Sequence, residues 1–548
     1  MPDPRPLLPW WAAMLVAVLA GFVTDAAYPE LAIWPLVFVG IALALIAQIG
    51  RSVGGAFLIA YVYGATFYLL HVEWTSRYLG PVPWLALSLF EALFVGVGGI
   101  AITLGYRWVP RAWPGRWARL VALPAVVAAL WIGKETVIGS FPYGGFPWAR
   151  LAVSQSQSPF AETVSWVGFA GLGFAMAWAT ASAIEWVRVS VERRTLREPL
   201  PKAMVGLAPL AAVLVVIGAV PAWPTASAGS TTVASVQGNG PAGYFDERSA
   251  GDVLNAQVGA TTPLLGRDDI DVLLWPEGSV DDSVNPGTAA ARTLDRLTAD
   301  LDAPLIANTV TVRGDEYFNT SFLWRSGEGI TQTYDKRHPV PFGEYIPDRD
   351  FYMFFAPDLI GLVQRGYSPG TNPPVFDLGD TIAGLAICFD VIYDEVIHEA
   401  ARDGAELYLL QTNNADFRGT DENQQQLAFA RLRAIETGRW VVNLSTVGRS
   451  QVIDPAGRTV DALPSDQPGA MVTEVGLRTG LTPSVVLGGW VDGVISIGGL
   501  AALLIAFALG RRRGAFAAAS GAEAPGRETS AFDASAPENA NRPASAEG

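Results

Sequence analysis

Hydrophobic residues form long runs between Pro9 and Val220 and again near residue 500. An apolar run of about 20 residues can cross a bilayer as a helix. A cleaved signal peptide is the alternative for the first run, but further runs follow at once and its removal would leave an odd number of spans. The pattern predicts eight membrane-spanning helices, over Pro9–Val23, Leu31–Ile49, Val53–Val72, Val82–Tyr106, Arg119–Gly133, Val164–Val187, Ala203–Val220 and Val485–Gly510.

Between residues 231 and 480 the pattern changes to short β-rich runs alternating with helical stretches. This alternation is typical of an α/β domain, and strands that are apolar on both faces indicate sheets buried on both sides. We expect strands over Thr231–Gln237, Asp271–Trp275, Pro304–Val312, Ser321–Arg325, Thr331–Asp335, Ile382–Cys388, Leu407–Gln411, Trp440–Ser445 and Gln451–Asp454. We expect helices over Ala289–Leu301, Glu395–Asp403 and Asn423–Thr437.

Composition supports a membrane protein and excludes a disordered chain. Half of the residues are hydrophobic and 16% are charged, against about 25% charged in a typical soluble domain. Residues 231–480 hold 36 acidic and 18 basic residues, a net charge of −18, whereas the rest of the chain has a net charge of +3. An acidic domain does not suit a phosphate backbone, so we expect no nucleic-acid partner.

Basic residues fix the expected orientation, because cytoplasmic loops of membrane proteins are enriched in Lys and Arg. Alternate ends of the predicted spans carry 14 basic residues, and the opposite short loops carry only Arg77, Lys134 and Arg150. We therefore expect both termini in the cytoplasm and the acidic domain, together with the loop Gly139–Phe160, on the outer side. The predicted organisation is a membrane domain over 1–222 with seven helices, an extracytoplasmic domain over 231–480, an eighth helix over 485–510 and a disordered cytoplasmic tail over 514–548.

Candidate chemistry gathers where three predicted strands end. Glu277 follows the run Leu-Leu-Trp-Pro, Lys336 follows Tyr-Asp, and Cys388 follows Gly-Leu-Ala-Ile. Cys388 is the only cysteine, which excludes an intramolecular disulfide and a multi-cysteine metal site. A lone cysteine is most often a small buried hydrophobic residue, so its neighbours must decide its role.

Lys336 is the only lysine of the acidic domain, in which every other basic residue is arginine. A stray lysine in an arginine-biased composition is the simple interpretation. The alternative is that this position requires a compact ammonium whose pKa can be shifted, which arginine cannot supply.

The three residue types together fit acyl transfer through a thioester. Glu277 would take the thiol proton of Cys388, and Lys336 would stabilise the oxyanion, with the backbone N–H of Phe389 as a second donor. A cysteine–histidine pair using His338 or His398 is the weaker alternative, because each fits a surface or capping residue. Since no metal-ligand spacing and no nucleotide-binding loop is found, we expect no metal and no cofactor.

These motifs resemble those of the nitrilase superfamily: Trp-Pro-Glu277, then Lys336 in Lys-x-His-x-x-Pro-Phe-Gly-Glu344, then Cys388 at a strand end. The chain up to Arg513 is similar to the bacterial apolipoprotein N-acyltransferase family. The resemblance implies an extracytoplasmic nitrilase-like α-β-β-α sandwich domain on an eight-helix membrane base. It also implies that Glu277 is the general base, Lys336 the oxyanion stabiliser and Cys388 the nucleophile, with Glu344 helping to orient them.

Two segments depart from the family pattern. Many members have Cys-Tyr-Glu at the nucleophile, where this chain has Cys388-Phe389-Asp390, and many have Asn-Asp-x-Trp-Phe where this chain has Asn413-Asn414-Ala415-Asp416-Phe417. We expect these loops to border the lipid entrance, so the departures concern the choice of donor lipid and leave the three reactive residues unchanged.

The function that the resemblance implies is lipoprotein maturation in the bacterial plasma (inner) membrane. A phospholipid acyl donor would acylate Cys388, and the N-terminal amine of a diacylglyceryl-modified apolipoprotein acceptor would then attack the thioester. One alternative is a membrane-tethered nitrilase-type amidase or hydrolase with water as acceptor. Another is a degenerate lipoprotein-binding module without activity, which the presence of all three reactive residues argues against.

Overall fold

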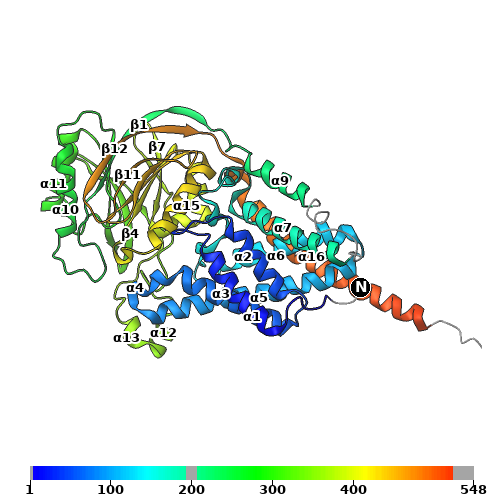
Figure 1. Ribbon diagram of the computed structural model, residues 1–548. Helices are drawn as coiled ribbons and strands as arrows, with labels where there is room; N and C mark the ends of the chain where they lie inside the picture. Colours follow the sequence, from blue (N-terminus) through cyan, green and yellow to red (C-terminus); the bar gives the residue numbers. More distant parts are fainter. Residues whose placement is uncertain (1–3, 193–206, 523–548) are drawn as a thin grey trace, which may run out of the picture.

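The computed structural model describes residues 4–192 and 207–522. It has two parts: a bundle of apolar helices, and a domain of two β-sheets seated on one end of that bundle (Figure 1). Some of our predictions fall outside the described residues. They concern the first residues of the seventh span, the tail beyond Ala522 and four of the basic residues expected in the cytoplasm, Arg193, Arg194, Arg197 and Lys202.

Each of the eight predicted apolar runs contains a helix. These helices are α1 (Trp10–Asp25), α2 (Leu36–Gln48), α3 (Val53–His71), α5 (Pro81–Ala112), α6 (Leu123–Ile138), α7 (Val164–Glu192), α9 (Ala208–Gly218) and α16 (Pro483–Ala522). Within the described residues, five segments are long and apolar enough to cross a membrane: Val53–His71, Pro81–Ala112, Ala118–Ile138, Ala161–Glu192 and Pro483–Arg513. The helices α1, α2 and α9 are shorter.

Several helices run further than the sequence predicts, among them α5, α6, α7 and α16. The helix α6 continues past Gly133 to Ile138 because the charged residues there have partners within the bundle. Lys134 lies 4.2 Å from the centre of the Trp131 ring, and the Trp131 indole N–H donates to Glu135. The helix α16 continues past Gly510 to Ala522, through part of the segment that we expected to be disordered.

Small residues allow the helices α3 and α5 to pack closely. A Cβ atom added at Gly64 of α3 would lie 2.8 Å from Cβ of Val95 in α5, and one added at Gly96 of α5 would lie 2.7 Å from the Phe57 ring. Such small-residue contacts are a common basis of helix association in membranes, where burial from water gives no driving force.

The second part contains two six-stranded sheets. The first has the order β12-β1-β2-β3-β4-β5, and the second has the order β11-β10-β9-β8-β7-β6. The first sheet consists of β1 (Ala226–Gln237), β2 (Val272–Leu274), β3 (Leu305–Arg313), β4 (Glu316–Arg325), β5 (Gly329–Asp335) and β12 (Gly469–Thr479). The second consists of β6 (Val375–Asp377), β7 (Ile382–Ile387), β8 (Leu407–Thr412), β9 (Trp440–Ser445), β10 (Ser450–Ile453) and β11 (Thr459–Leu463).

The strands β1, β2 and β3 are parallel neighbours, as are β7, β8 and β9. Our sequence prediction included neither the strands β6, β11 and β12 nor the helix α10 (Asp252–Thr261).

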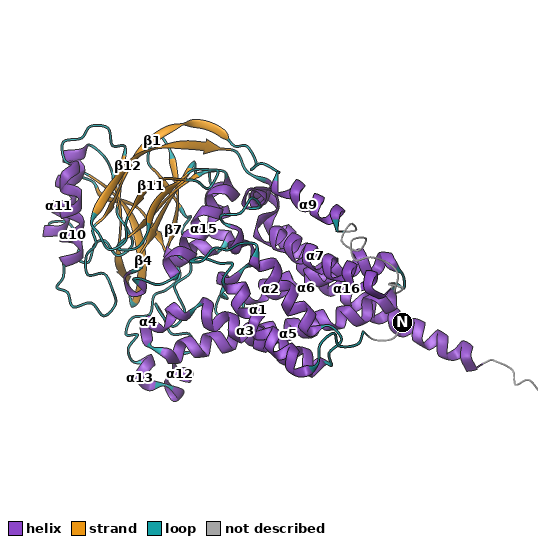
Figure 2. Ribbon diagram, in the orientation of Figure 1, coloured by secondary structure: helices purple, strands orange, loops and turns teal. Residues whose placement is uncertain are grey.

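Hydrophobic cores join these layers. Leu274 and Ile306 of the first sheet share one buried cluster with Leu385 and Leu409 of the second, so the sheets pack face to face. The outer face of the first sheet is covered by α10 and α11 (Ala289–Leu301), and these helices lie farthest from the bundle (Figure 2). The outer face of the second sheet is covered by α14 (Asp394–Arg402) and α15 (Glu422–Thr437), whose buried side chains join the core of the helix bundle.

The loop Gly139–Phe160 lies between the bundle and the sheets. It contains two short 3₁₀ turns, Pro147–Ala149 and Leu151–Gln155. Its Trp148 indole N–H donates to the side chain of Gln425 in α15 at 2.6 Å, and its Arg150 pairs with Asp394 of α14 at 2.6 Å. Polar contacts as well as apolar packing therefore fix the sheet domain to the bundle.

Candidate active site

The residues that we predicted at strand ends come from both sheets. Glu277 is the third residue after β2, Lys336 comes directly after β5, and Cys388 comes directly after β7. The Lys336 ammonium lies 3.4 Å from a carboxylate oxygen of Glu277 and 2.8 Å from one of Glu344. The charges of Glu277 and Lys336 both act on the Cys388 thiol. The strand ends thus gather two carboxylates, an ammonium and a thiol in one place.

Asn319 of β4 holds the two carboxylates in position. Its side-chain amide donates to Glu277 at 2.7 Å and to Glu344 at 3.1 Å. The other carboxylate oxygen of Glu344 accepts from the backbone N–H of Val340 at 2.7 Å. Glu344 therefore fixes both Lys336 and the loop that follows it.

Cys388 stands at a strained turn. Its φ angle is +49°, in the left-handed region that residues other than glycine seldom adopt. Such strain is found at sites where the surrounding structure holds a reactive side chain in place. The Cys388 side chain is partly exposed, and its sulfur accepts a hydrogen bond from the side-chain amide of Gln426 at 3.4 Å.

Asp390 connects the turn at Cys388 to the loop that follows Lys336. Its fully buried carboxylate accepts from the backbone N–H groups of Ile387 and His338 and from the Tyr334 hydroxyl. These bonds span both sides of the site, from the end of β7 to the residues after Lys336. The adjacent Phe389 follows Cys388 in the 3₁₀ turn, and its ring stacks against Trp148 of the loop Gly139–Phe160.

Burial and charge set the protonation of these groups. Burial raises the pKa of Glu277, and the positive charge of Lys336 opposes that rise. Burial alone would lower the pKa of Lys336, but the carboxylates of Glu277 and Glu344 outweigh it and raise the pKa well above its usual value. Burial and the charge of Glu277 raise the pKa of the Cys388 thiol, against the opposing effect of Lys336. At neutral pH the resting site therefore holds an ammonium and a protonated thiol.

Both histidines of the sheet domain have partners other than the thiol. The His338 ring stacks on Tyr393 with centroids 3.7 Å apart and lies 2.9 Å from the Glu395 carboxylate. His398 pairs with Glu436 at 3.1 Å. These contacts favour the glutamate–lysine–cysteine arrangement over a cysteine–histidine pair.

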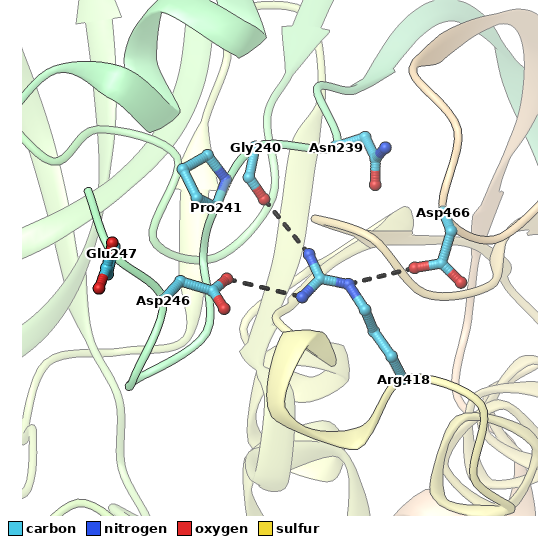
Figure 3. A pocket seen from close by; sticks show the side chains of 7 residues that line it. All are labelled: Asn239, Gly240, Pro241, Asp246, Glu247, Arg418 and Asp466. Atoms are coloured by element: carbon cyan, nitrogen blue, oxygen red, sulfur yellow. Dashed lines mark hydrogen bonds and ion pairs between the residues drawn. The ribbon is translucent and has the colours of Figure 1, made fainter. Parts of the chain in front are cut away.

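The described residues include no metal-ligand cluster, and the wide depression that they form lies apart from the predicted site residues. Among the residues that the structure describes, no group of three or more His, Cys, Asp or Glu side chains is arranged to hold a metal ion. A wide depression of about 490 Å³ lies elsewhere, around Arg418, which pairs with Asp466 at 3.1 Å and with Asp246 at 3.5 Å (Figure 3). None of the five predicted site residues lines it.

We did not predict Asn319 or Gln426 as parts of the site, although they bond to Glu277 and Cys388. Asn319 lies inside β4 and Gln426 inside α15, and the sequence around each residue does not indicate which residues it contacts in the folded protein. Asp390 was noticed only as a departure from the Cys-Tyr-Glu pattern, although it bonds to both sides of the site.

Comparisons with known proteins first define the class. Residues 232–480 match the family model for a carbon-nitrogen hydrolase, and residues 20–182 match that for the N-terminal domain of apolipoprotein N-acyltransferase. The chain is also similar to the solved structure of Saccharomyces cerevisiae Nit3, a member of the nitrilase superfamily, with 18% identity over 48% of this chain and 94% of that one, and a TM-score of 0.35.

Full-length relatives then define the family. The apolipoprotein N-acyltransferase of Mycolicibacterium smegmatis is 31% identical over 525 residues, which cover 90% of this chain and 85% of the relative. That of Azotobacter vinelandii is 30% identical over 92% of this chain and 96% of the relative. The chain belongs to the apolipoprotein N-acyltransferase family. The predicted nitrilase-like carbon-nitrogen hydrolase domain is confirmed, and the long apolar helices together with this family identify a membrane protein.

Proposed function

We propose that this protein transfers an acyl chain from a phospholipid to the N-terminal amine of the S-diacylglyceryl-cysteine of an apolipoprotein, and so completes lipoprotein maturation. Membership of the apolipoprotein N-acyltransferase family supports the reaction class. The observation that carries the mechanism is the close grouping of Glu277, Lys336 and Glu344 beside the strained, partly exposed Cys388.

The first half-reaction acylates the enzyme. Glu277 takes the proton from the Cys388 thiol, and the thiolate attacks the ester carbonyl carbon of the phospholipid. Lys336 and the Phe389 backbone N–H stabilise the oxyanion that forms. The bond from the carbonyl carbon to the glycerol oxygen then breaks, Glu277 returns the proton to that oxygen, and a lysophospholipid leaves behind a thioester on Cys388.

The second half-reaction forms the amide. The neutral amine of the acceptor attacks the thioester carbonyl, and the same donors stabilise the second oxyanion. Glu277 accepts a proton from the attacking nitrogen, the carbon–sulfur bond breaks, and the proton passes to the departing sulfur. The products are an N-acylated lipoprotein and the free thiol, so Glu277 ends each cycle ready to act again.

The proposed topology places this chemistry at the outer leaflet. The helices α1, α2, α3, α5, α6, α7, α9 and α16 are the eight spans, the termini are cytoplasmic, and the sheets with their covering helices form an extracytoplasmic α-β-β-α sandwich over 231–480. The distribution of basic residues supports this orientation. The contacts of the Cys388 turn with the bundle loop support access from the membrane, because Phe389 stacks against both Phe146 and Trp148.

A transfer assay tests the proposed function. The purified full-length protein, supplied with phospholipid and a diacylated lipopeptide, should add one amide-linked acyl chain to the lipopeptide and release an equal amount of lysophospholipid. Cys388→Ala should abolish both products. Release of free fatty acid with no N-acylated peptide would instead favour the hydrolase alternative, and full activity of Cys388→Ala would favour a binding module.

A further inference from the structure

We propose that Gln426 is a further residue of the reaction centre: its side-chain amide donates a hydrogen bond to the nucleophilic sulfur of Cys388, and Asn414 and Glu422 hold that amide in the donating orientation. This inference rests on the role of Cys388 in the proposed function. Gln426 would add a hydrogen-bond donor to the Glu277–Lys336–Cys388 arrangement. This donor comes from α15, the helix that packs between the second sheet and the bundle.

The contact is direct and partly buried. The amide nitrogen of Gln426 lies 3.4 Å from Sγ of Cys388, within the range of a hydrogen bond to sulfur. Gln426 is 2% exposed and lies in the second turn of α15, the helix that packs between the second sheet and the bundle. It therefore approaches the sulfur from a different element than Glu277 or Lys336.

Neighbouring hydrogen bonds fix the direction in which the Gln426 amide points. The backbone N–H of Gly448 donates to the Ser445 hydroxyl, which donates in turn to the amide oxygen of Asn414 at 2.5 Å. The amide nitrogen of Asn414 must therefore donate outward, and it lies 3.0 Å from the amide oxygen of Gln426. Because the Gln426 amide oxygen accepts this hydrogen bond, the oxygen points toward Asn414 and the amide nitrogen points toward the Cys388 sulfur.

Glu422 helps to hold the Asn414 amide in this orientation and is mostly uncharged at neutral pH. Its carboxyl accepts the second N–H of Asn414 at 2.8 Å. Burial raises the pKa of Glu422 to about 8, despite the opposing effect of the Asn414 hydrogen bond, and the negative charge of Glu277 adds to the rise. Glu422 is therefore mostly neutral at pH 7 and ionises as the pH rises through about 8.

The electrostatic surroundings of the sulfur explain why a neutral donor is useful. The charges of Glu277 and Glu344 disfavour the Cys388 thiolate, and Glu422 does so once it ionises, whereas Lys336 favours the thiolate. A hydrogen bond to the charged form favours that form. Gln426 stabilises the thiolate without adding a second cation that would compete with Lys336 for the carboxylates.

The single cysteine makes this inference directly testable. Alkylation of the purified full-length protein by iodoacetamide reports on Cys388 alone, because the chain has no other thiol. We expect Gln426→Leu to slow alkylation at pH 7 about tenfold, because loss of a donor to the thiolate raises the thiol pKa by about one unit. The pH profile of the rate should move to higher pH by the same amount.

Gln426→Glu is a second variant that preserves the shape of the side chain. It replaces the donor with an acceptor, so it should slow alkylation at least as much as Gln426→Leu. Matched controls are Gln424→Leu and Gln424→Glu on the same helix, because the Gln424 amide lies beside the Arg449 guanidinium. These controls should keep the wild-type pH profile.

Wild-type profiles for both Gln426 variants, or equal shifts in the Gln424 controls, would overturn the proposal. Asn414→Asp provides a third check, because it removes the N–H that holds the Gln426 oxygen and should shift the profile in the same direction. Alkylation requires neither phospholipid nor lipopeptide. Normal alkylation of a wild-type protein that transfers no acyl chain would therefore count against the proposed function and leave the Gln426 contact intact.

Discussion

At the residue scale, the reaction centre is defined by a lysine that is almost completely buried between carboxylates. Lys336 is 1% exposed and contacts both Glu277 and Glu344. The two carboxylates outweigh the effect of burial and raise the lysine pKa well above its usual value. Lys336 therefore stays cationic throughout the neutral range, as its proposed role of oxyanion stabiliser requires.

Removing this charge should slow enzyme acylation severely. We expect Lys336→Met to reduce the rate of acyl-enzyme formation by about 10²–10³-fold, the usual effect of losing one oxyanion donor. The rate is measured by mass spectrometry of the intact protein after mixing with phospholipid. Arg337→Met is the matched control, because the Arg337 guanidinium pairs with Glu399 instead. Equal rates in Lys336→Met and wild type would contradict the assigned role.

The pH dependence of acylation should report on Glu277. Its pKa is raised by burial, and the general base must be deprotonated to accept the thiol proton. The rate should therefore rise with pH, with a midpoint above the ordinary glutamate range, and fall as the pH drops through that midpoint.

Loss of the Lys336 charge should raise the pKa of Glu277 further, because that charge lowers it in the wild type. The residual activity of Lys336→Met should accordingly have its midpoint at higher pH. A midpoint that moves to lower pH would show that another group controls the profile.

Part of this site could be predicted from the sequence. Glu277, Lys336 and Cys388 follow strands, and Glu344 lies in the Pro- and Gly-containing loop after Lys336, where a chemical role can be recognised locally. Asn319 and Gln426 lie inside a strand and a helix, and only tertiary packing brings them to Glu277 and Cys388.

At the element scale, α15 connects the reaction centre to the bundle. Gln426 contacts the Cys388 sulfur, and the adjacent Gln425 accepts hydrogen bonds from the indole groups of Trp74 and Trp148. Further along the helix, the fully buried Arg433 pairs with Glu436 at 2.6 Å and with Asp394 at 2.8 Å. One helix thus positions the sulfur and anchors the sheet domain.

Loss of the buried Arg433 should destabilise this junction. We expect Arg433→Met to reduce the free energy of unfolding by about 3–5 kcal/mol, because Glu436 would lose its main buried partner. Denaturant titration of the purified protein in detergent measures this change. Arg431→Met on the same helix is the control, since Arg431 is only partly buried and bonds to the backbone of Gly457. An equal loss in both variants would argue against a specific role for the buried network.

The apolar helices were easier to predict from the sequence than several of the strands. Each of the eight long apolar runs contains a helix, and five segments among the described residues are long and apolar enough to cross a membrane. The strands β6 and β11 were missed because β6 has three residues and β11 is largely exposed. The strand β12 contains Gly469 and Gly476, which weaken the local β pattern. Its long antiparallel pairing with β1 stabilises it as a strand, and this pairing cannot be seen in the local sequence.

At the scale of the whole molecule, the proposed orientation brings two lipid-anchored substrates to one thiol. Cysteine labelling tests it in a Cys388→Ala background. We expect a membrane-impermeant maleimide to label Ser326→Cys, in the turn between β4 and β5, in intact spheroplasts. Arg512→Cys, in α16, should be labelled only after permeabilisation. The opposite pattern would place the sheet domain in the cytoplasm and exclude the proposed topology.

The central claim is that Cys388 carries the acyl chain between donor and acceptor, and trapping the acyl-enzyme tests it most directly. The full-length protein is incubated with phospholipid alone and analysed by intact-mass and peptide mass spectrometry. We expect a mass increase of one acyl chain on Cys388 that hydroxylamine removes and that Glu277→Gln fails to form. An acyl group on any other side chain, or no adduct in a preparation that still N-acylates lipopeptide, would contradict it.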